Sequence, residues 1–151
     1  MANVQTFDEI KSVLAAVGER EAKAARIAET IRRSRDYRWA GIYEIDHQEI
    51  AAIAWTGPDA PAFPRFPKTK GLCGAAILAG KTIAVGDVTK DPRYLTTFGS
   101  TKSEIVVPIF ARPDRPALGL LDVESEKLHA FQESDRVFLE NCATLVISLF
   151  P

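Results

Sequence analysis

The sequence predicts an α+β fold in which N- and C-terminal helices cover one face of a largely antiparallel sheet of about five to six strands. Both ends of the chain have apolar residues at helical spacing, whereas the middle has short, partly alternating apolar runs. Clusters of turn-forming residues separate those runs. With 151 residues, the chain is about one ordinary domain long, so we expect residues 1–151 to form a single domain.

The N-terminal region predicts helices. Thr6 and Glu9 have the spacing of a capping box, which would start the first helix there. Gly18 interrupts the pattern, and residues 19–35 resume it, so two amphipathic helices or one bent helix fit equally well. The apolar residues at helical spacing are Phe7, Ile10, Leu14, Val17, Ile27 and Ile31.

After this region, the spacing of the apolar residues changes from a helical period to that of strands. Residues 39–45 and 50–55 are short apolar runs, and residues 46–49 between them are typical of a hairpin tip. Residues 57–67 contain four prolines, which predict an extended surface loop and exclude a central strand or a helix.

The second half continues with short elements. Residues 71–80 predict a short helix bounded by glycines, residues 82–85 a short strand, and residues 87–99 a loop with one helical turn. The clearest strands follow at residues 104–110 and 118–125. A final helical stripe runs almost to the C-terminus and contains Phe131, Phe138, Cys142, Leu145 and Leu149.

Composition excludes several classes of protein. Nineteen Lys and Arg residues against twenty Asp and Glu residues give a formal net charge of -1, which lacks the electrostatic footprint of a nucleic-acid binder. No apolar run is long enough to span a bilayer, and the N-terminus does not resemble a signal peptide, so we expect a cytoplasmic protein without membrane association. Two cysteines, with His47 and His129 far from ligand spacing, predict no metal site and no cofactor.

Cys73 is the one candidate nucleophile. It lies between two glycines at the start of the predicted helix, where the helix dipole favours a thiolate. The alternative is a small buried hydrophobic residue near a helix end. Cys142 lies in the middle of the C-terminal apolar stripe, so we expect it to pack in the core.

Three acids stand within or beside apolar strands. Glu104 opens one strand, while Asp122 and Glu124 alternate with apolar residues and therefore share a sheet face. That face is either exposed to water or lines a pocket for a cationic group such as an amino-acid ammonium. Trp39 and Tyr43 share a strand face too and could form an aromatic wall, although their spacing does not show whether it is the same face.

Five stretches occur in a characteristic order: Trp39–Tyr43, Lys70–Gly74, Val85–Val88, Lys102–Ile109 and Gly119–Ser125. Together they resemble the GAF domain family, and more narrowly its free methionine-(R)-sulfoxide reductase branch, over about residues 6–150. The resemblance implies a central antiparallel sheet, helices on its faces and a small-molecule pocket under loops.

In that branch a cysteine thiolate attacks the sulfoxide sulfur, and a second cysteine resolves the sulfenic acid as a disulfide. The resemblance implies that Trp39 and Tyr43 form the ligand wall. It also implies that Glu104, Asp122 and Glu124 hold the substrate ammonium and assist at the sulfoxide. The family more often has Asp at the position of Glu124, so this side chain is one methylene longer.

The cysteines depart from the pattern of the resembled branch. Cys73 matches a resolving cysteine, but Thr97 occupies the position of the attacking cysteine and Phe63 that of another family cysteine. A threonine hydroxyl has too high a pKa to replace a thiolate and cannot perform its redox cycle. We therefore expect a stand-alone, sensor-like GAF domain that binds a zwitterionic or amine-bearing metabolite.

Two other readings remain open. In one, Cys73 attacks the sulfoxide and thioredoxin or another external thiol resolves it. In the other, the chain is a homodimeric interaction protein with a vestigial pocket, because the apolar stripes of the terminal helices suit a dimer surface. For a signalling role, any output must pass through a separate protein. Three inward acids favour cations and zwitterions over anions, which disfavours cyclic nucleotides.

Overall fold

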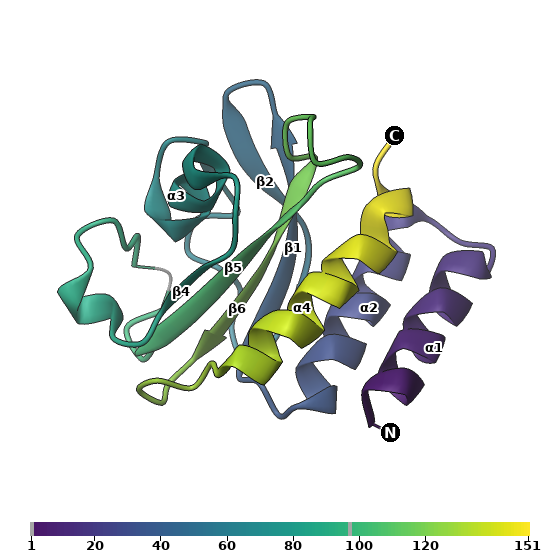
Figure 1. The fold of residues 1–151 in the computed structure, drawn as a ribbon, viewed down its shortest axis with the longest axis horizontal. Coiled ribbons are helices and arrows are strands. Elements are labelled where there is room, and N and C mark those ends of the chain that lie inside the picture. Colours follow the sequence, from purple (N-terminus) through teal and green to yellow (C-terminus); the bar gives the residue numbers. More distant parts are fainter. Residues whose placement is uncertain (1, 97) are drawn as a thin grey trace.

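The computed structural model describes residues 2–96 and 98–151, with four α-helices and six strands (Figure 1). The helices are α1 (Ala2–Ala15), α2 (Arg20–Ser34), α3 (Gly71–Ala79) and α4 (Glu133–Leu145). The strands are β1 (Trp39–Asp46), β2 (Glu49–Thr56), β3 (Arg65–Pro67), β4 (Ile83–Val85), β5 (Ser103–Ile109) and β6 (Gly119–Ser125). Short 3-10 turns, η1 (Val88–Lys90) and η2 (Val146–Leu149), complete the elements.

The strands form one six-stranded sheet in the order β3-β2-β1-β6-β5-β4, and every neighbouring pair is antiparallel. The two central strands, β1 and β6, come from distant parts of the sequence. This architecture confirms the predicted α+β class and the upper end of the predicted strand number.

The two faces of the sheet are covered differently (Figure 1). α2 and α4 pack directly on one face, and α1 lies outside them against both. α3 and the long loops cover the other face. The apolar stripes of the terminal helices form the larger core with alternate residues of the strands, among them Ile27, Ile31, Ile42, Ile105, Leu121, Val123 and Phe138. None of the helices in the described ranges has the length and apolar character needed to cross a bilayer.

One local prediction was wrong, and another is confirmed only in part, because residues 57–67 contain no central strand or helix but are not a loop throughout. α1 begins at Ala2, so Thr6 and Glu9 lie inside the helix instead of capping it, because no glycine or proline precedes them to prevent helix formation. The proline-rich loop ends in the short strand β3, which pairs with β2 at the edge of the sheet. An edge strand tolerates proline since only one of its sides needs hydrogen-bond donors. The N-terminal region forms two helices, not one bent helix.

Substitution of Phe138 tests the packing of the core between the terminal helices and the sheet. It is fully buried, its ring stacks on Phe7 with centroids 5.7 Å apart, and the Arg35 guanidinium lies 4.6 Å from its centroid. We expect Phe138→Ala to lower the free energy of unfolding by about 3–5 kcal/mol. The neighbouring Val137, which is 47% exposed, provides the control, and Val137→Ala should cost less than about 1 kcal/mol. If urea unfolding showed equal losses of unfolding free energy in Phe138→Ala and Val137→Ala, this packing would be contradicted.

Candidate functional site

The pairing of β1 with β6 places the predicted aromatic residues and acids on one face. Trp39 pairs with Glu124, and Gly41 pairs with Asp122. Directly opposite residues of an antiparallel pair point to the same side of the sheet. The aromatic pair and the acids therefore share the face under α3, which the spacing in the sequence left undecided.

The neighbouring strand adds the third acid. Glu104 of β5 pairs with Glu124 of β6, so its side chain also points to this face. The relative exposure of the three residues is 5% for Glu104, 3% for Asp122 and 1% for Glu124. A sheet face exposed to water, the alternative that periodicity left open, is therefore wrong for this part of the sheet.

An aromatic wall lies beside the acids. Trp39 contacts Tyr43, with ring centroids 6.4 Å apart, and Phe98, at 5.5 Å. Tyr43 also meets Phe66 edge-on at 6.0 Å. Gly41 leaves room for these rings, because a Cβ at this position would lie 2.5 Å from Cη2 of Trp39.

The hydrogen bonds and ion pairs of the acids differ from one residue to the next. Oε1 of Glu124 accepts a hydrogen bond of 2.8 Å from the Thr101 hydroxyl. No amide, hydroxyl, ammonium or guanidinium group in the described part of the chain donates to Oδ1 of Asp122. Within residues 2–96 and 98–151, neither Glu104 nor Asp122 forms an ion pair with a lysine, arginine or histidine.

Burial changes how these acids titrate. It raises the pKa of Glu104 well above its ordinary value, and the nearby charges of Asp122 and Glu124 raise it further. Burial also raises the pKa of Asp122, against the effect of side-chain hydrogen bonds with Glu104 and Glu124. A carboxyl–carboxyl hydrogen bond needs a proton, so the cluster retains protons at pH values where exposed carboxyls are fully ionised.

Cys73 meets the acids from α3. Its Sγ and one oxygen each of Glu104 and Asp122 all lie within 4.8 Å of one another. Burial, followed by the charges of the carboxyls, raises the pKa of the Cys73 thiol well above its ordinary value. Of the two alternatives that the sequence left open for Cys73, the structure therefore favours the small buried residue over the thiolate, because desolvation and three neighbouring acids outweigh the dipole of a nine-residue helix.

The second cysteine lies elsewhere. Cys142 is fully buried among the residues that join α4 to the sheet, on the face opposite to Cys73. Burial raises the pKa of its thiol to about 12. Both cysteines are free thiols. These positions confirm that Cys142 packs in the core.

A small cavity lies where these groups meet. It measures about 20 Å³, which is room for one water molecule but not for an amino acid. Apart from Tyr43, its apolar lining comes from loops, from the short edge strand β3 and from the short helix α3, where periodicity does not predict which side chains face the cavity. The lining residues are Tyr43, Phe63, Phe66, Gly71, Leu72, Cys73, Leu95, Glu104 and Asp122.

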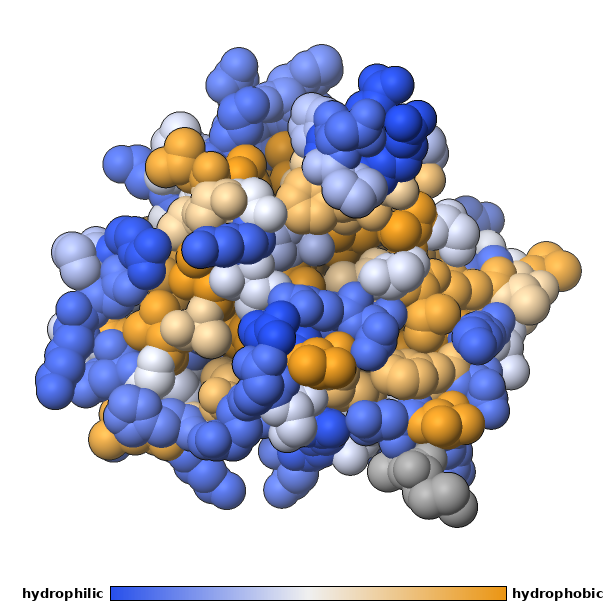
Figure 2. All heavy atoms as spheres, viewed as in Figure 1, coloured by the Kyte–Doolittle hydropathy of each residue, from blue (hydrophilic) through white to orange (hydrophobic). Residues whose placement is uncertain are grey.

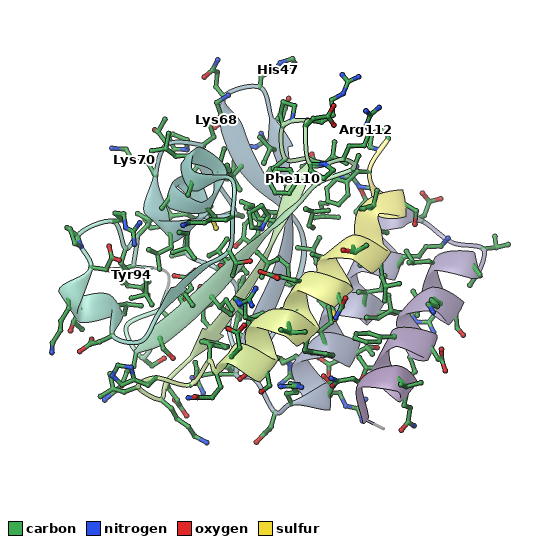
Figure 3. The ribbon with its side chains drawn as sticks, in the orientation of Figure 1. His47, Lys68, Lys70, Tyr94, Phe110 and Arg112 are labelled. Carbon is green, nitrogen blue, oxygen red and sulfur yellow. The ribbon has the colours of Figure 1, made fainter. Side chains whose placement is uncertain are left out.

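The remaining candidates lie in different places. Thr97, which takes the position of the attacking cysteine in the resembled branch, lies outside the described residues. Phe63, the other replaced position, lines the cavity. His47 lies at the outer end of the β1–β2 hairpin (Figure 3), and His129 is exposed after β6.

Known proteins of similar sequence include a GAF domain-containing protein and a reductase. "GAF domain-containing protein A" from Dictyostelium discoideum is 31% identical over 139 residues, covering 91% of this chain and 85% of that protein. "Free methionine-R-sulfoxide reductase" from Saccharomyces cerevisiae is 36% identical over 114 residues, covering 74% of this chain and 62% of the yeast protein.

Solved structures that resemble this fold also include both a reductase and a GAF protein. A free methionine-R-sulfoxide reductase from Neisseria meningitidis, in complex with its substrate, superimposes with a TM-score of 0.87 at 31% identity, covering 98% of this chain and 87% of that one. A GAF sensor protein described as putative, from Burkholderia vietnamiensis, also gives 0.87, at 28% identity over 99% and 93% of the two chains. The family model for the GAF domain matches residues 19–148. The chain therefore belongs to the GAF domain family.

Proposed function

We propose that this GAF domain binds a zwitterionic or amine-bearing metabolite in the pocket between α3 and the sheet. The observation that supports this proposal most directly is that Glu104 and Asp122 are buried side by side with no cationic partner among the described residues. A buried carboxylate without a counter-charge is costly. An ammonium group of a ligand would supply that charge, with Glu124 contributing a third acid beside it.

The aromatic wall supports the same class of ligand. Trp39 and Tyr43 would offer ring faces to a cation or to the apolar part of a metabolite. The surrounding acids would repel a phosphate or another anion. Cyclic nucleotides are accordingly a poor match for this pocket.

Ligand entry would require the pocket to open. Sites for small organic molecules usually measure about 300–1,000 Å³, far more than the present cavity of about 20 Å³. Phe63 and Leu95 line the cavity from the loops, so their displacement would enlarge it without disturbing the sheet. The Trp39 indole N–H donates to the Asp59 carbonyl at 3.2 Å and would hold the first of these loops against the wall.

A sensor role would need further contacts. Apolar side chains gather over the α1 and α4 side of the molecule (Figure 2), and Val4, Val17 and Val137 are well exposed. We expect this side to serve as the surface of a homodimer. The proposed sensor role would take place in the cytoplasm.

The second candidate is a free methionine-(R)-sulfoxide reductase that uses Cys73. The observation in its favour is that Cys73 contacts the acid cluster, and known reductases are among the similar proteins. Its thiolate would attack the sulfoxide sulfur and take the oxygen as a sulfenic acid, releasing methionine. Two external thiols, or thioredoxin, would then return Cys73 to the thiol, forming a disulfide and water. The raised pKa of Cys73 opposes the first step.

Binding of amine ligands should depend on the acids. In isothermal titration calorimetry with amino acids and simple amines, starting with methionine and its sulfoxide, we expect Asp122→Asn and Glu124→Gln each to weaken binding about tenfold or more. A charge-assisted hydrogen bond contributes about 1.5–3 kcal/mol. Glu126→Gln, which alters a half-exposed acid just after β6, should leave the affinity unchanged. Equal affinity in all three variants would contradict the proposal.

Stability should fall as the pH rises. Because the folded pKa values of Glu104 and Asp122 are raised, the native state holds more protons than the unfolded chain above the ordinary carboxyl range. Their contribution to stability is therefore full at low pH and is lost as the pH rises from about 5 upwards. The double variant Glu104→Gln/Asp122→Asn should show a flatter profile in urea unfolding and greater stability at pH 8. A wild-type slope in the double variant would argue against burial of these acids.

The reductase candidate is tested by turnover of free methionine-(R)-sulfoxide with dithiothreitol or thioredoxin. We expect no turnover, because burial raises the pKa of the Cys73 thiol well above its ordinary value and Cys142 lies on the opposite face of the sheet. Turnover that Cys73→Ser abolishes and Cys142→Ala preserves would instead establish the enzyme.

A further inference from the structure

Beyond an organic ligand, we infer that Cys73, Glu104 and Asp122 form a binding site for a divalent transition-metal ion of borderline softness, with Zn²⁺ as the best match. The sequence predicts no metal site because the three residues are far apart in the chain and belong to different elements. The fold brings them together: Cys73 comes from α3, Glu104 from β5 and Asp122 from β6.

The distances suit a metal ion. Sγ of Cys73 and one carboxyl oxygen from each acid lie within 4.8 Å of one another. In tetrahedral zinc sites the metal–ligand bonds are about 2.0–2.3 Å long, so ligand atoms lie about 3.3–3.8 Å apart. Side-chain rotations that move each atom by less than about 1 Å would close the site. Such adjustments need no movement of the strands.

A second observation points to a cation at the same place. Asp122 is only 3% exposed and lines the cavity, yet its Oδ1 receives no hydrogen bond from any amide, hydroxyl or cationic group of the described residues. A buried oxygen without a donor is costly unless a cation coordinates it. The cavity of about 20 Å³ accommodates an ion without the opening that an organic ligand requires.

The donor set selects the kind of ion. Mg²⁺ and Ca²⁺ bind through oxygen ligands, whereas a thiolate favours Zn²⁺ and related ions. Binding would release the Cys73 proton to solvent, since a coordinating thiol is deprotonated even when it is a weak acid in the free protein. One thiolate and two carboxylates leave one position of a tetrahedron open. Glu124 lies nearby, and its Oε1 already accepts the Thr101 hydrogen bond.

A metal ion and an ammonium ligand would compete for the same carboxylates. The metal site does not depend on the proposed metabolite, because the metal alone is the probe in the experiment below. Failure of an amine ligand to bind would therefore leave this inference standing, and failure of the metal to bind would leave the metabolite proposal standing.

The test is a titration of the full-length chain with Co²⁺, after treatment with a chelator. Cobalt bound to a thiolate gives a charge-transfer band in the near ultraviolet and intense visible bands when tetrahedral. We expect one equivalent of Co²⁺ to produce both, and Zn²⁺ to abolish them by displacement. Cys73→Ser should lose the charge-transfer band, and Asp122→Asn should weaken cobalt binding by more than about tenfold. Cys142→Ala is the matched control and should retain both signals.

Circular dichroism of each variant, and thermal unfolding with and without Zn²⁺, separate loss of binding from loss of fold. Zinc should raise the unfolding temperature of the wild-type chain and of Cys142→Ala, but not that of Asp122→Asn. The absence of a charge-transfer band in the wild type would overturn the inference. A band that survives in Cys73→Ser, or that disappears only in Cys142→Ala, would overturn it as well.

Discussion

The pairing of β1 with β6 and of β6 with β5 is the constraint on which the rest of the structure depends. It aligns Trp39 with Glu124, Gly41 with Asp122, and Glu124 with Glu104. Because side chains alternate along a strand, this register also sends the intervening aliphatic residues to the helix-covered face. A shift of one residue in either pairing would exchange the pocket residues for core residues.

The two faces of the sheet contribute to the stability of the domain in opposite ways. The face under α2 and α4 is continuously apolar, and its burial supplies the hydrophobic stabilisation of the domain. The face under α3 combines a smaller apolar cluster with three buried acids, which oppose folding when they ionise. The large core offsets the cost of burying Glu104 and Asp122 without a cationic partner among the described residues. Both proposals place a cation beside these two acids, where it would lower that cost.

The ionisation of the Cys73 thiol depends on what surrounds it in the fold. The start of a helix promotes thiolate formation when the site is open to solvent or positively charged. Here burial against acids raises the pKa of the thiol, which opposes nucleophilic attack. In the proposed metal site, the ion would displace the thiol proton, so the same surroundings would suit metal binding.

Periodicity in the sequence was sufficient for both layers of the fold and for the shared face of Asp122 and Glu124, because these depend on local geometry that repeats every 3.6 or 2 residues. Periodicity did not predict the extra turns of α1 before Thr6, where a capping pattern indicated a later helix start. It also did not predict the short strand β3, because prolines in this segment indicated a loop. Only the tertiary structure decided that the aromatic pair and the acids share one face, that loop residues such as Phe63 close it, and that burial raises the pKa of the Cys73 thiol. The physical reason is that strand register, burial and the field of neighbouring charges depend on residues distant in the chain.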